Sequence, residues 1–292
     1  MVTGASGIIG RALIPRLRGR DEVRATVRRP DAAVALRALG AKVAVNGCDD
    51  AEDLAEILPR VVTLIHLVGG PHQLDDDAVL DANHGSTVRA LAAAEMAGVP
   101  RFVLVSVPGA SSDAADPFLR AKGLAEEAVA ASGLEHAIIR SSHVFGLGGL
   151  WFTAVVQGAL EDPPVAIGGE ALVAPVFADD VAEVLSAVEE RPGKLAGTWA
   201  LEGPDVLTPS ALAGMLTDGD PHDRGLLEGS PDPAGRLEAL LDVALIPSAV
   251  RHLLDPARAD APDAAAAFSI VLTPLVEGLR RTLARAAEGP PN

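Results

Sequence analysis

The chain of 292 residues contains no tyrosine, a single cysteine and little positive charge. The lone cysteine, Cys48, excludes an internal disulfide and favours a reducing, cytoplasmic compartment. A formal net charge of −16 argues against a nucleic-acid surface, because the phosphates would be repelled. No apolar run reaches the ~20 residues of a spanning helix, so we expect no membrane span. The absence of tyrosine excludes any mechanism in which a protein phenol donates the proton.

What remains is the composition of a folded globular protein. Apolar residues make up 49% of the chain and charged residues 22%, which is too hydrophobic for a disordered polymer. The length can accommodate one large α/β domain with an appended lobe.

Glycine recurs at every third position near the start of the chain, at Gly4, Gly7 and Gly10, directly after the pair Val2-Thr3. In a βαβ unit the first glycine permits a tight turn, the second lets a diphosphate approach, and the third lets helix and strand pack closely. A helix that begins here directs free N–H groups at the phosphates. The pattern is specific only when strands and helices alternate after it.

Such alternation continues as far as residue 140. Apolar strand patterns occur at 23–27, 43–45, 61–68, 102–107 and 136–140, and helical patterns at 32–39, 52–58, 78–97 and 118–131. This order predicts a doubly wound parallel sheet of the Rossmann type. Only three residues precede Gly4, whereas a central strand usually has about five or six. Either the first strand is short or the natural start lies upstream of Met1.

After residue 145 the pattern changes to glycine-rich turns, helical segments at 179–190 and 274–287, and a strand at 198–201. We predict a first domain at 1–145 and a small, mostly helical C-terminal lobe at 146–292, with 173–203 packing back on the sheet. The acidic, glycine- and proline-rich segment 218–233 is predicted to be a loop, and 236–254 a helix.

Several segments resemble the extended and atypical short-chain dehydrogenases/reductases, and most of all the atypical NAD(P)H-binding branch. That branch includes the nitrogen-regulator-like proteins and the nucleotide-binding accessory subunit of respiratory complex I. The segments that carry the resemblance are 2–10, 27–30, 65–69, 97–106, 120–127, 139–146 and 175–182. The resemblance implies a bound nicotinamide dinucleotide and a substrate crevice above the C-terminal strand ends.

The family also has a Tyr-x-x-x-Lys pair and a hydroxyl at the end of the fifth strand. Here the pair is Phe118 and Lys122, and the hydroxyl position falls near Val107-Pro108, with Ser106 just before it. The tyrosine mechanism is therefore excluded. For Lys122 three roles stay open: contact with the nicotinamide ribose, acid–base catalysis, or a solvated surface position.

The resemblance assigns cofactor contacts to Gly4, Ala5, Ser6, Gly7, Ile8, Ile9, Gly10, Arg28, Arg29, Asp49, Leu67, Val68, Gly69, Ser106 and Lys122. Arginines after the second strand favour the 2′-phosphate of NADP(H) over NAD(H), with a solvated basic cluster as the alternative. Arg11 is a further candidate for that phosphate. Either Asp49 or Asp50 matches the acidic residue near the adenine.

Two residues after the sixth strand are candidates for substrate contact: His143, and Trp151 of the aromatic pair Trp151-Phe152. The alternative for the aromatic pair is the core of the lobe. The histidines do not have metal-ligand spacing, so we predict no metal site.

These observations predict an NAD(P)H-dependent oxidoreductase that reduces a quinone- or enone-type small molecule, because such acceptors can take their proton from water. A non-catalytic dinucleotide-binding sensor or assembly protein is the alternative. An epimerase/dehydratase-like enzyme is a second alternative, which the missing tyrosine disfavours. The sequence leaves the oligomeric state open, a homodimer included.

Overall fold

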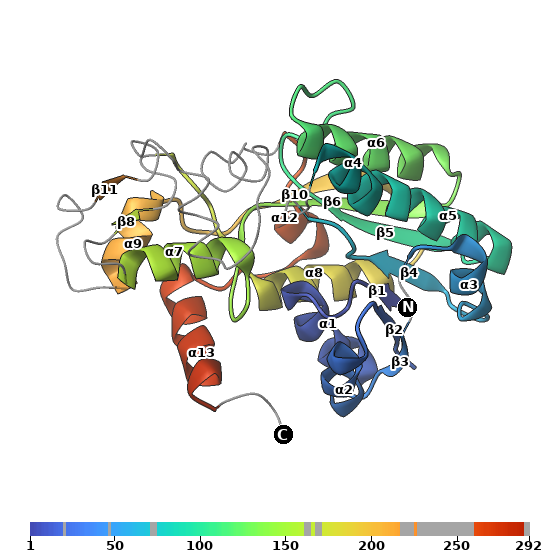
Figure 1. Cartoon of the computed structure of the whole chain (residues 1–292), viewed down its shortest axis with the longest axis horizontal. Coiled ribbons are helices and arrows are strands. Elements are labelled where there is room, and N and C mark those ends of the chain that lie inside the picture. The colour runs from blue at the N-terminus through green and yellow to red at the C-terminus, as the bar shows by residue number, and fades with distance from the viewer. Residues whose placement is uncertain are drawn as a thin grey trace.

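The computed structural model describes residues 1–19, 22–45, 48–70, 75–160, 165–166, 171–216, 225–226 and 260–288. A parallel sheet lies between two layers of helices, and further helices gather at one end of the molecule (Figure 1). Apart from residues 225–226, the predicted loop at 218–233 and the predicted helix at 236–254 lie outside the described residues. Within these ranges no helix combines the length and the apolar character that a bilayer crossing requires.

Seven strands form the main sheet in the order β10-β6-β5-β4-β1-β2-β3, and every neighbouring pair is parallel. The strands are β1 (Val2–Thr3), β2 (Arg24–Val27), β3 (Lys42–Val45), β4 (Thr63–His66), β5 (Arg101–Ser106), β6 (Glu135–Ser141) and β10 (Ala196–Leu201). The predicted doubly wound Rossmann-type sheet is confirmed. The strand order reverses between β1 and β4, where ligands of such folds bind at the carboxyl ends.

Helices cover both faces of the sheet (Figure 1). One layer, which shares a core with the sheet, contains α1 (Ile8–Arg18), α2 (Pro30–Ala38), α8 (Ala178–Glu190) and α12 (Ala264–Phe268). The opposite layer contains α3 (Ala51–Glu56), α4 (Asp76–Leu80), α5 (Ser86–Ala97) and α6 (Pro117–Ala131). The single helix predicted at 78–97 is interrupted by the π-helical turn η1 (Asp81–Gly85), where the Asn83 side chain bonds to the backbone of Gly70.

Three helices of the C-terminal part lie at one end of the molecule (Figure 1). They are α7 (Leu150–Leu160), α9 (Pro209–Leu216) and α13 (Leu275–Glu288). Two short parallel pairs accompany them, β7 (Val144–Phe145) with β9 (Val176–Phe177) and β8 (Val165–Ala166) with β11 (Gly225–Leu226). Their aromatic core joins Phe145, Phe152 and Phe177 to Phe118 of α6. The helices of this end therefore pack directly against the element that carries Lys122.

The acidic pair Asp179-Asp180 in the first turn of α8 also binds the C-terminal segment that contains α13. Asp179 accepts two hydrogen bonds from Arg285, at 2.9 and 2.7 Å, and Asp180 accepts two from Thr273, both at 2.7 Å. Both carboxylates are buried, and burial raises the pKa of Asp180 above its usual value. Such buried acids are tolerated because each has found donors.

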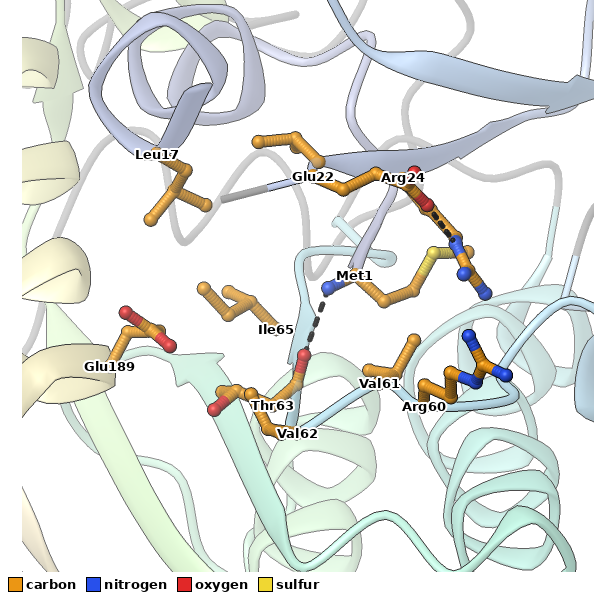
Figure 2. A pocket seen from close by; sticks show the side chains of 11 residues that line it. Met1, Leu17, Glu22, Arg24, Arg60, Val61, Val62, Thr63, Ile65 and Glu189 are labelled. Atoms are coloured by element: carbon orange, nitrogen blue, oxygen red, sulfur yellow. Dashed lines mark hydrogen bonds and ion pairs between the residues drawn. The ribbon is translucent and has the colours of Figure 1, made fainter. Parts of the chain in front are cut away.

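A cavity of about 350 Å³ lies at the amino ends of β1, β2 and β4. Figure 2 shows the Met1 ammonium donating to the carbonyl oxygen of Thr63 at 2.9 Å, and Arg24 paired with Glu22. This edge of the sheet is opposite the one where parallel α/β folds bind ligands. The functional site is therefore expected at the other edge of the sheet.

Gly123 tests how closely α6 packs against the backbone of the preceding segment. A Cβ there would lie 2.0 Å from the carbonyl carbon of Ser111 and 2.2 Å from the amide nitrogen of Ser112. Gly123→Ala gains about 1 kcal/mol of helix propensity but forces a backbone shift that costs roughly 1–3 kcal/mol. We expect a lower urea midpoint for Gly123→Ala. Gly19→Ala is the control, because the nearest atom to its Cβ lies 4.0 Å away; equal midpoints for both variants would contradict this packing.

Candidate functional site

The glycine turn between β1 and α1 is held against the end of β4. Gly4 has a φ of +66°, and a Cβ on it would lie 2.7 Å from the carbonyl carbon of Leu67. A Cβ on Gly10 would lie 2.4 Å from the carbonyl oxygen of Ala5. At Gly7, however, a Cβ would meet only the carbonyl oxygen of Gly4, at 3.5 Å. Packing within the protein therefore requires glycine at positions 4 and 10, but not at position 7.

Gly7 is the N-cap of α1, and no side chain caps that helix. The first N–H groups of α1 are thus available to an anion, and the missing Cβ of Gly7 leaves room for its approach. This arrangement fits a diphosphate without any adjustment of the turn.

A cavity of about 730 Å³ runs over the turn and the carboxyl ends of β1, β2 and β4. Nine residues predicted to contact the cofactor line it: Gly4, Ser6, Gly7, Arg28, Arg29, Asp49, Leu67, Val68 and Gly69. Ala5 and Gly10 are buried beneath the turn, and Ile8 and Ile9 line the neighbouring cavity.

The two arginines after β2 differ in their partners. Both are exposed. Arg29 pairs with Asp31 at 3.3 Å, whereas Arg28 has no ion pair within the described residues. Arg28 is thus the more available cation at this end of the cavity. Arg11 does not line this cavity, because its guanidinium donates to the carbonyl oxygen of Leu147 at 3.2 Å. The expectation that Arg11 joins the arginines is therefore wrong.

The structure also separates Asp49 from Asp50. Asp50 caps α3 by accepting from the amides of Glu52 and Asp53 at 2.8 and 3.0 Å. Asp49 is exposed and lines the cavity. The sequence left the two aspartates equivalent, and the helix cap distinguishes them.

Sequence reasoning missed Arg89, which lines the same cavity from α5. Its guanidinium donates to both carboxylate oxygens of Asp81, at 2.8 and 3.1 Å, and to the carbonyl oxygen of Cys48 at 2.6 Å. The eight-residue spacing on an interrupted helix carries no motif that would have identified the pair. The Cys48 thiol is buried beside them, and burial raises its pKa to about 11.

A second cavity, of about 250 Å³, lies at the carboxyl ends of β5 and β6 and shares Leu67 and Gly69 with the first. Its wall is mostly apolar and comes from α1, β5, α6 and the start of α7. Its polar members are Ser106, Lys122, Ser141, Ser142, His143 and Trp151. The structure therefore brings the predicted residues Ser106, Lys122, His143 and Trp151 together in one chamber. Phe152 lies instead in the aromatic core of the C-terminal helices.

Lys122 is buried, with only 5% of its surface exposed, so the solvated surface position is wrong. Its ammonium donates to the carbonyl oxygen of Val105 at 3.2 Å. Burial lowers the pKa of Lys122 to about 8, against the attraction of Glu126. Phe118, one helical turn earlier, also lines the cavity and carries no hydroxyl.

Two internal networks hold the backbone of the site. Asn83 accepts from the Gly70 amide at 3.0 Å and donates to the Gly70 carbonyl oxygen at 3.1 Å, which holds the segment that follows β4. His66 lies between Thr3 and Ser86, at 2.8 and 3.3 Å, and burial lowers its pKa to about 3. His66 is therefore a neutral structural residue. The described residues contain no group of three or more metal-ligand side chains.

Comparison with known proteins agrees with this geometry. Residues 4–146 match the model of a family described as NAD(P)H-binding. Over 230 residues the chain is 30% identical to Arabidopsis thaliana NADH dehydrogenase (ubiquinone) 1 alpha subcomplex subunit 9, mitochondrial; the match covers 74% of this chain and 56% of that relative. Over 223 residues it is 28% identical to a Streptomyces griseus (4-alkanoyl-5-oxo-2,5-dihydrofuran-3-yl)methyl phosphate reductase, covering 74% and 72%.

Solved structures share the fold over nearly the whole chain. The dTDP-glucose 4,6-dehydratase DesIV from Streptomyces venezuelae, with NAD bound, has a TM-score of 0.76 at 20% identity, covering 99% of this chain and 96% of that one. Citrobacter sp. triphenylmethane reductase, complexed with NADP(H), has a TM-score of 0.73 at 19% identity, covering 96% and 98%.

The fold, the glycine turn and the family match together define an NAD(P)-binding Rossmann domain. More particularly, the domain at residues 4–146 matches the NAD(P)H-binding family, and the chain is similar in sequence to complex I subunit 9.

The titration of Lys122 is testable in the protein alone. Between pH values of about 8 and 10.5 the unfolded chain binds a proton at Lys122 that the folded chain does not, so the free energy of unfolding rises with pH in this window. Lys122→Met lacks that rise. We expect the variant to be more stable than the natural protein at neutral pH, with the gap narrowing as the pH rises. Urea unfolding across the window measures this, with exposed Lys194→Met as control. A difference in the free energy of unfolding that does not change with pH would contradict the lowered pKa of Lys122.

Proposed function

We propose that the protein binds NADPH in preference to NADH and reduces a conjugated carbonyl compound of the quinone or enone type without a tyrosine proton relay. One observation carries the proposal: the cavity over the glycine turn and the mostly apolar chamber lined by Lys122 share the lining residues Leu67 and Gly69. A dinucleotide laid along the first cavity directs its nicotinamide end into the second. Within the predicted C-terminal part, 146–292, the residues Gly149, Leu150 and Trp151 line that chamber.

Each part of the cofactor has a matching group on the protein. The N–H groups at the start of α1 face the diphosphate, and Gly7 leaves space for it. Arg28, which has no ion pair within the described residues, offers its guanidinium to the 2′-phosphate, and Asp49 lies at the adenosine end of the same cavity. Lys122 holds the nicotinamide ribose hydroxyls from the floor of the chamber.

The choice of acceptor follows from Phe118. A bound reduced nicotinamide would supply a hydride and leave oxidised. The acceptor's carbonyl oxygen would take up the displaced electron pair and water would supply the proton, so the acceptor would gain two electrons and two hydrogens. Phe118 has no proton to give, which disfavours simple ketones whose alkoxide must be protonated as it forms. A conjugated acceptor spreads the charge and does not need this proton. Such a small-molecule reductase fits a cytoplasmic protein.

Two comparisons support a reductase. The Streptomyces griseus relative is named as a (4-alkanoyl-5-oxo-2,5-dihydrofuran-3-yl)methyl phosphate reductase, and the ring in that name has a double bond conjugated to carbonyl groups. The Citrobacter structure is a reductase complexed with NADP(H).

The second candidate is a non-catalytic dinucleotide-binding sensor or assembly protein, which Phe118 and the similarity to complex I subunit 9 favour. An epimerase/dehydratase-like activity agrees with the fold of the neighbours. The missing tyrosine counts against it.

Turnover separates these candidates. NADPH binding is measured by melting shift, and NADPH oxidation is then followed with menadione, 1,4-benzoquinone and 2-cyclohexenone. We expect oxidation with at least one conjugated acceptor and none with saturated cyclohexanone. Tight NADPH binding without turnover would support the sensor, and the absence of dinucleotide binding would rule out both.

Arg28→Ala tests the nucleotide preference. Losing one charge-assisted hydrogen-bond partner costs about 1.5–3 kcal/mol, so we expect NADPH affinity to fall at least tenfold while NADH affinity stays unchanged. Arg29→Ala is the matched control, because Arg29 is already paired with Asp31. Isothermal titration with both dinucleotides provides the measurement. Equal losses for NADPH and NADH, or a larger effect at Arg29, would place the 2′-phosphate elsewhere.

A further inference from the structure

Two buried polar groups in the inner chamber have no hydrogen-bond partner within the described part of the chain. They are the hydroxyl of Ser106, whose residue is 1% exposed, and the indole N–H of Trp151, whose residue is 4% exposed. An unsatisfied buried group costs about 1–3 kcal/mol, so two of them in one place need an explanation.

Both residues line the same cavity of about 250 Å³, yet they come from distant elements. Ser106 is the last residue of β5, and Trp151 lies in the first turn of α7. The His143 ring meets the Trp151 ring edge to face, with centroids 4.9 Å apart and planes at 88°, and this contact fixes the indole in the wall. The remaining wall is largely apolar, with Phe118 among its members.

The chemistry of the two groups limits what can satisfy them. An indole N–H is only a donor, so its partner must carry a lone pair, and a serine hydroxyl can donate to the same atom. Both donors are neutral. The ammonium of Lys122 donates to the carbonyl of Val105, and its other N–H groups are assigned to the ribose hydroxyls by the proposed function. A neutral carbonyl oxygen on a flat apolar molecule matches this wall better than a carboxylate or a phosphate does.

We propose that Trp151 Nε1–H and Ser106 Oγ–H bind the carbonyl oxygen of the substrate. This inference rests on the proposed function, and it assigns a specific binding position to the conjugated carbonyl. Negative charge gathers on that oxygen as the acceptor is reduced, and preorganised donors bind the charged oxygen more strongly than the neutral one. The two residues thus replace the missing phenol as hydrogen-bond donors, while the proton itself comes from water.

The chain is well suited to a direct test, because it has two tryptophans and no tyrosine. Protein labelled with ¹⁵N-tryptophan gives two indole N–H signals, and Trp199→Phe identifies the one from Trp151. NADP⁺ is added first, and 2-cyclohexenone is then titrated into the complex, in which no turnover occurs. We expect the enone to move the Trp151 signal downfield and leave the Trp199 signal in place, and cyclohexene, which lacks the oxygen, to move neither.

Kinetics give a second readout. Trp151→Phe and Ser106→Ala each remove one donor, so we expect kcat/KM for the enone to fall about tenfold in each variant, with NADPH affinity unchanged in Trp151→Phe. Phe152→Leu, in the adjacent core, is the control that leaves both donors in place.

Three results would overturn the inference. A Trp151 signal that moves with NADP⁺ alone and not with the enone would assign the donors to the nicotinamide carboxamide. Enone turnover without any movement of that signal would refute the binding of the substrate carbonyl by Trp151 and Ser106. Unchanged kinetics in both variants would do the same. Neither result would contradict the proposed reductase function. Absence of any NADPH-dependent melting shift would instead refute the proposed function, and the inference with it.

Discussion

The close approach of two backbone segments sets the geometry of this protein. The turn at Gly4 touches the backbone of Leu67, at the end of β4, so closely that a Cβ would lie 2.7 Å from it. This contact joins the first strand to its neighbour at the point where the strand order reverses. Both cavities meet at Leu67, so the same contact determines where the cofactor cleft ends and where the inner chamber begins.

Buried polar side chains then hold the backbone behind that contact. Asn83 clamps Gly70 from a π-helical turn, and His66 bonds to Thr3 within the sheet. These groups are satisfied, which is what a rigid cleft requires. By contrast, Ser106 and Trp151 in the inner chamber lack partners within the described residues. The difference separates the polar groups that build the site from those that can receive a ligand.

The fold was predictable from local patterns because β4 and β5 lie in apolar runs and because strand and helix patterns alternate as far as residue 140. The glycine spacing identified the dinucleotide turn for the same reason, since a tight turn and a close helix leave no room for a side chain. The C-terminal part was less predictable. Helix α7 begins directly after glycine-rich turns, and its packing against Phe145 depends on contacts far apart in the chain.

The sequence by itself determined the Rossmann-type sheet, the position of the glycine turn and the loss of the tyrosine, because these depend on residue identity and short-range spacing. Only the tertiary structure decided which partner each of two neighbouring residues contacts. Asp50 caps a helix while Asp49 lines the cleft, and Asp31 neutralises Arg29 while Arg28 stays free of an ion pair within the described residues. Neighbours along a chain share a sequence context, but folding gives each of them different partners in space.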